Sequence, residues 1–96
     1  MSPADPGPVV AQVSLIEFPC RFPIKIMGRT REGFAQAMLE IVQRHAPDFD
    51  GAMLEMRSSS AGNYLSLTAT VNATSREQLD RLYVDLVAHP MVAMVL

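Results

Sequence analysis

The sequence has no tryptophan, one cysteine and few aromatic residues, and these shortages exclude several kinds of site. Of its 96 residues, 6% are aromatic, Cys20 is the one cysteine and two residues are histidine. One cysteine cannot form an internal disulfide, and with two histidines it supplies too few thiolate and imidazole ligands for a structural zinc site. We therefore predict no metal, no cofactor and a reducing compartment.

Positive charge is also scarce, because eight Lys and Arg stand against ten Asp and Glu and the formal net charge is -2. Such a chain offers no broad cationic surface to duplex DNA or to an anionic membrane. No apolar run approaches the ~20 residues that cross a bilayer. The N-terminus lacks the basic start of a signal peptide. We expect a cytoplasmic protein without nucleic-acid or membrane partners.

Hydrophobic residues make up 49% of the chain and charged residues 19%, the balance of one small globular domain. Residues 1–15 include Pro3, Pro6, Gly7 and Pro8 and are predicted to form a disordered tail. The domain is expected over residues 16–96.

Hydrophobic periodicity predicts four strands and two helices. Residues 20–27 alternate as a half-buried strand that Gly28 ends, and Thr30 can cap a helix that reaches His45. Residues 52–58 and 64–72 form a predicted hairpin. A capping box, Thr74 with Glu77 or Ser75 with Gln78, starts a second helix that ends near His89. Residues 91–96 form the last strand.

This order predicts an α+β fold, the ferredoxin-like βαββαβ sandwich, with a four-stranded antiparallel sheet in the order 4-1-3-2 and two helices on one face. Four methionines, Met53, Met56, Met91 and Met94, fall on the predicted edge strands. The last strand is apolar at both alternating sets of positions, which suits a covered edge. We predict a homo-oligomer or a protein partner there, through Met91, Val92, Met94, Val95 and Leu96; the alternative is that the second helix and the core cover this strand.

The topology should bring the turn at Gly28 and the hairpin loop 58–63 to one end of the sheet. Free backbone N–H groups at a helix start, beside arginine, can seat a carboxylate or phosphate. The alternative is a plain glycine turn and a solvated hairpin. Lys25 should lie on the open face, opposite Glu55 or the hydroxyls of the third strand. The candidate ligand-binding residues are Lys25, Gly28, Arg29, Thr30, Ser59, Gly62, Asn63 and Tyr64.

A thiol enzyme would need Cys20, His45 and Asn72 as nucleophile, base and orienting group. Cys20 alternates with core residues, and His45 suits the end of a helix. Outward positions of the third strand carry hydroxyls instead of the aromatic residues on which RNA bases stack. We therefore expect no catalytic residues and no RNA binding.

Several motifs, in order, carry a resemblance to a known family: FPIKIMG, VQRHAPDFD, SSSAGNYLSLT, NATSREQL and the final MVL. From Glu17 to Leu96 the chain resembles the YbeD-like family of small bacterial proteins, for which no activity is established. The resemblance implies a fold similar to ACT regulatory domains, which bind small ligands near the turn that corresponds to Gly28, Arg29 and Thr30. It also implies a gene context near the lipoate-attaching octanoyltransferase. Together these features predict a non-enzymatic, ACT-like regulatory module that self-associates, with a sensor or enzyme for a small carboxylate or phosphate as the alternative.

Overall fold

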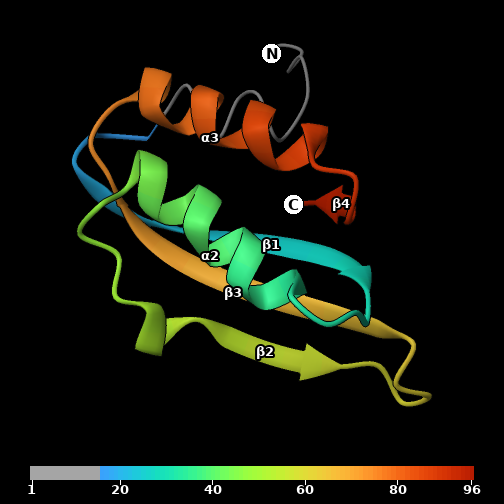
Figure 1. The fold of residues 1–96 in the computed structure, drawn as a ribbon. Helices are drawn as coiled ribbons and strands as arrows, with labels where there is room; N and C mark the ends of the chain where they lie inside the picture. The colour runs from blue at the N-terminus through green and yellow to red at the C-terminus, as the bar shows by residue number, and fades with distance from the viewer. Residues whose placement is uncertain (1–15) are drawn as a thin grey trace, which may run out of the picture.

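The computed structural model describes residues 16–96, so the predicted tail, residues 1–15, lies outside the described residues. Figure 1 shows a sheet with both helices against one face. The strand order is β2-β3-β1-β4 and the neighbouring strands pair antiparallel, which confirms the predicted ferredoxin-like α+β fold. In chain order the elements are β1 (Cys20–Arg29), α2 (Phe34–His45), the 3-10 turn η1 (Gly51–Met53), β2 (Glu55–Ser58), β3 (Tyr64–Ala73), α3 (Arg76–Ala88) and β4 (Val92–Val95).

The core lies between the helices and the two central strands. Every second residue of β1 and β3 faces the helices and is buried or partly buried, and the residues between them face the opposite side. Removal of these apolar side chains from water is the main force that holds the layers together. The fully buried apolar strand residues are Ile24, Ile26, Leu67, Ala69, Val71 and Ala73, and the helices add Phe34, Met38 and Val42 from α2 and Leu79, Leu82 and Leu86 from α3.

The first helix begins later than predicted. Gly28 does not end β1, which continues through Arg29 and pairs Gly28 with both Leu65 and Val92. Thr30 is therefore not the helix cap. Gly33 takes that place with φ of 86° and no side-chain cap, a left-handed conformation that glycine adopts without steric cost.

The second helix begins with one of the two predicted capping boxes. The Ser75 hydroxyl accepts a hydrogen bond from the backbone N–H of Gln78 at 3.1 Å. The Gln78 side chain reaches back and accepts from the N–H of Thr74 at 2.6 Å. These bonds satisfy backbone donors that the helix start leaves free.

Both edge strands are shorter than predicted. The Asp50 carboxylate accepts a hydrogen bond from the N–H of Ala52 and caps η1, so β2 begins only at Glu55 and Met53 lies outside it. At the other edge His89 Nδ1 accepts from the N–H of Met91, and β4 begins at Val92. Neither helix of residues 16–96 has the length and apolar character that a bilayer span needs.

Candidate functional site

The predicted gathering of loops at one end of the sheet is confirmed. The N–H of Thr30 donates to the carbonyl of Asn63 at 2.9 Å, which ties the end of β1 to the hairpin loop. Arg29 and Tyr64 are partners in the β1–β3 ladder, and the Arg29 guanidinium lies 5.5 Å from the centre of the Tyr64 ring. This cation–π pair lies on the sheet face that the helices leave open.

The hairpin loop holds its own shape. The Ser59 N–H donates to the Tyr64 carbonyl, and the Ser59 hydroxyl accepts from the Tyr64 N–H. Gly62 has φ of 79°, a conformation that favours glycine, and its N–H donates to the carbonyl of Ser59. Ser59 and Gly62 thus have a clear part in closing the hairpin.

Gly28 faces the helices, away from the open face of the sheet. A Cβ atom at this position would lie 2.9 Å from the Phe34 ring and closer still to the Met91 carbonyl oxygen. The space beside Gly28 is therefore filled by the protein itself. Lys25 lies on the opposite face and three residues back along β1, a rise of about 10 Å. The eight candidate residues do not form one pocket, although Arg29, Thr30, Ser59, Gly62, Asn63 and Tyr64 share the hairpin end.

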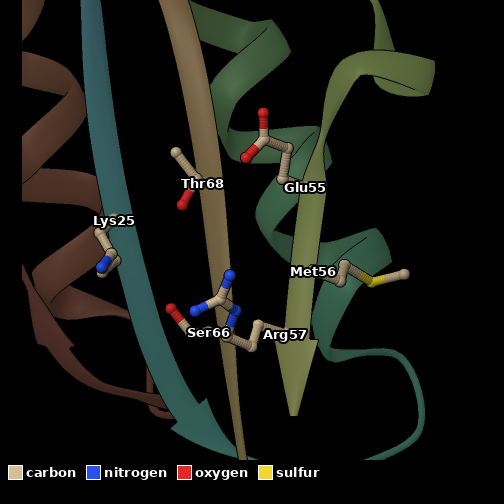
Figure 2. A pocket seen from close by; sticks show the side chains of 6 residues that line it. All are labelled: Lys25, Glu55, Met56, Arg57, Ser66 and Thr68. Carbon is tan, nitrogen blue, oxygen red and sulfur yellow. The ribbon is translucent and has the colours of Figure 1, made fainter.

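A shallow hollow of about 270 Å³ lies in the middle of the open face. Thr68 of β3 pairs with Lys25 on one side and with Glu55 on the other, as the sequence predicted for Lys25. Figure 2 shows the Arg57 side chain lying across β3 above Ser66. The residues lining the hollow are Lys25, Glu55, Met56, Arg57, Ser66 and Thr68.

Arg57 is the member of this hollow that sequence reasoning missed. It lies two residues after Glu55 on a strand with a period of two, so both side chains share one face. That alternation could have identified Arg57 as a neighbour of Glu55. The strand is short, however, and the pairing of Arg57 with Ser66 depends on the register of the hairpin.

The residues of the thiol-enzyme hypothesis are kept apart by the fold. Cys20 pairs with buried Ala73 and faces the helices, whereas Asn72 pairs with Arg21 and faces the open side. The His45 ring is engaged elsewhere, with its Nε2 2.6 Å from an Asp85 carboxylate oxygen. These three side chains cannot act on one substrate.

A second cluster of polar side chains joins α2 to α3. Arg44 also approaches Asp85, at 3.8 Å, beside a hollow of about 320 Å³ between the ends of α2 and α3. Within residues 16–96, no three His, Cys, Asp or Glu side chains gather closely enough to hold a metal ion.

The outer edge of β4 combines free backbone groups with exposed apolar side chains. Leu96 and Lys25 exchange two backbone hydrogen bonds, at 2.8 and 3.1 Å. In an antiparallel ladder the next residue, Val95, therefore directs its N–H and C=O to the free edge. Met94 is 51% exposed and Leu96 62% exposed on the open face.

The helix above this edge, α3, also exposes two apolar side chains. Val84 and Val87 of α3 are 66% and 65% exposed. The Tyr83 hydroxyl donates to the carbonyl of Leu96 at 3.3 Å, which joins α3 to the end of the chain. Burial raises the pKa of this hydroxyl above the ordinary value for tyrosine.

Comparison with known proteins identifies a family over nearly the whole chain. The family described as "Protein of unknown function (DUF493)" matches residues 13–96. A UPF0250 protein of Nitrosomonas europaea is 60% identical over 87 residues, which cover 91% of this chain and 100% of that protein. A UPF0250 protein of Bordetella pertussis is 59% identical over 86% of this chain and 91% of its own length. The similarity to YbeD-like proteins that the motifs indicated is confirmed.

Proposed function

The chain belongs to the DUF493 family of proteins of unknown function, and we propose that it is a non-catalytic, ACT-like regulatory module that self-associates through β4. The observation that carries this proposal is the edge formed by β4 and α3. Unpaired backbone groups on an apolar strand are a template for pairing with another chain. Here exposed apolar side chains flank such an edge on both the sheet side and the helix side.

A second copy would pair the free backbone groups of this edge and cover its exposed apolar side chains. A twofold axis through it would set two β4 strands antiparallel, and Val95 would then find backbone partners across the axis. The two α3 helices would lie on the same side of the joined sheet, where Val84 and Val87 could bury each other. Met94 and Leu96 would be covered from the open face.

A charge placed on this edge should separate the copies. We expect the wild-type protein to sediment as a dimer and Met94→Lys to sediment as a monomer, because the lysine would face its own symmetry mate in an apolar contact. Sedimentation equilibrium over a range of protein concentrations measures the difference.

Met56→Lys is the matched control, because Met56 is a 62% exposed methionine on the opposite edge strand. This variant should remain a dimer. A wild-type protein that stays monomeric at high concentration, or a dimer that survives Met94→Lys, would disprove association through β4.

The regulatory part of the proposal rests on the ACT-like resemblance and on the lack of a catalytic cluster among the described residues. The gene context implied by the resemblance, beside the lipoate-attaching octanoyltransferase, supports lipoate metabolism as the setting. Thermal unfolding with octanoate, lipoate and amino acids tests for a regulatory ligand, because a compound at 100 times its dissociation constant adds about 2.7 kcal/mol to stability. If none of these compounds raises the unfolding midpoint, regulation would act through a protein partner instead of a small ligand.

A further inference from the structure

The open face of the sheet collects positive charge on an otherwise acidic chain. All charged residues within the four strands lie on this face, and of the five only Glu55 is acidic. The rest of the sequence therefore holds four Lys and Arg against nine Asp and Glu. The four cations of this face, which we call the cationic face, are Arg21, Lys25, Arg29 and Arg57.

The ion pairs in the described part of the chain leave the cationic face untouched. Arg44 and His45 approach Asp85, and Arg76 approaches Asp80, all on the two helices. The cations of the sheet are instead exposed to solvent. Gathered like charges repel one another and favour a negatively charged partner.

The spacing of these cations indicates the size of that partner. Arg21, Lys25 and Arg29 follow one another at four-residue intervals along β1. At about 3.3 Å per residue, the row spans about 26 Å. Ser66 and Thr68 lie between this row and Arg57 and can donate hydrogen bonds to carboxylates (Figure 2). A row of this length exceeds a single small anion and suits a protein segment with several carboxylates.

We propose that the cationic face is a docking surface for an acidic segment of a partner protein. Nucleic acid fits this surface less well. Single-stranded RNA binds such sheets by stacking bases on aromatic side chains. The outward residues of β3 are Ser66, Thr68, Thr70, Asn72 and one aromatic residue, Tyr64, whose ring Arg29 already covers. The surface shares no residue with the β4 edge, although Lys25 pairs with Leu96 beside it, and it does not depend on self-association.

A labelled poly-glutamate peptide, titrated with the protein at low salt and followed by fluorescence anisotropy, tests this docking surface. The Lys25→Gln/Arg57→Gln variant should bind the peptide at least about tenfold more weakly than wild type, a loss of about 1.4 kcal/mol. The control variant Arg76→Gln/Arg81→Gln also removes two positive charges, but from exposed positions on α3. It should bind the peptide with an affinity within about twofold of wild type.

Three results would overturn the docking surface. An equal loss in both variants would show that only net charge matters and would overturn it, as would a wild-type protein that does not bind the peptide. Tighter binding of a uridine oligonucleotide than of poly-glutamate would overturn it in favour of RNA. If circular dichroism shows the first variant unfolded, Arg21→Gln/Arg29→Gln takes its place against the same control. Sedimentation of each variant separates a docking defect from a loss of dimer.

Discussion

At the scale of single residues, Gly28 shows how one missing side chain lets three elements meet. It pairs with β3 and β4 and packs beneath the Phe34 ring of α2, next to the Met91 carbonyl. Neither the backbone oxygen nor the buried ring can move aside without disturbing the core. Gly28 is therefore a packing requirement, and this explains its place in the family motif without a ligand.

Gly28→Ala should destabilise the protein by about 2 kcal/mol, because an added methyl group overpacks a filled core. Urea unfolding followed by circular dichroism measures the change. Gly51→Ala is the matched control, since its nearest contact is the end of the flexible Leu39 side chain, and it should cost clearly less. Equal losses in the two variants would contradict this account of Gly28.

The sequence indicated Gly28 as special but for another reason. A glycine after an alternating segment predicts the end of a strand, because glycine tolerates turns. Gly28 stays within β1 because it pairs with Leu65 and Val92, while Phe34 and Met91, which are distant in sequence from one another, fill the space beside it. Local pattern could not show that they converge on this position.

At the scale of secondary-structure elements, local hydrogen bonding decided which boundaries could be predicted. The start of α3 was predictable because the Ser75 hydroxyl accepts a hydrogen bond from the N–H of Gln78, three residues later, which is the spacing of a capping box. The start of α2 was not predictable from the sequence. The N–H of Thr30 donates to the hairpin loop, and Gly33 begins the helix through its backbone conformation alone. The Asp50 side chain caps η1, and β2 is therefore shorter than predicted.

The contact between α3 and the end of the chain should weaken at high pH. Burial raises the pKa of Tyr83, so the folded state keeps the phenol proton at pH values where the unfolded state has lost it. The stabilisation is complete below about pH 10, the ordinary pKa of tyrosine, and is lost as pH rises through the folded pKa. Ionisation would also remove the hydrogen bond to Leu96.

Wild type should therefore exceed Tyr83→Phe in unfolding free energy near neutral pH, with a gap that narrows above about pH 10. Urea titrations at several pH values measure this gap. Tyr64→Phe alters the other tyrosine, which is 48% exposed. This variant should lose unfolding free energy above about pH 10 as the wild type does. A gap that stays constant through the alkaline range would rule out the role of Tyr83.

At the scale of the whole molecule, the fold gathers residues that are scattered along the sequence into two surfaces, the cationic face and the β4 edge. Topology was predictable, because the order of strands and helices and right-handed crossovers leave few arrangements. The cationic face was not, because net charge conceals it and strand register is needed to bring Arg57 beside Lys25. The expectation that no broad cationic surface exists is thus too simple at the level of a single sheet face.

Self-association through β4 should also be visible in the stability of the whole molecule. If folding and pairing are coupled, the unfolding midpoint should rise by about 3–5 °C for each tenfold increase in protein concentration, because mass action favours the dimer. Scanning calorimetry at several concentrations measures this slope. Met94→Lys should give a midpoint independent of concentration, while Met56→Lys should keep the wild-type slope. A wild-type midpoint that does not change with concentration would mean that the domain is stable as a monomer and that β4 needs no second copy.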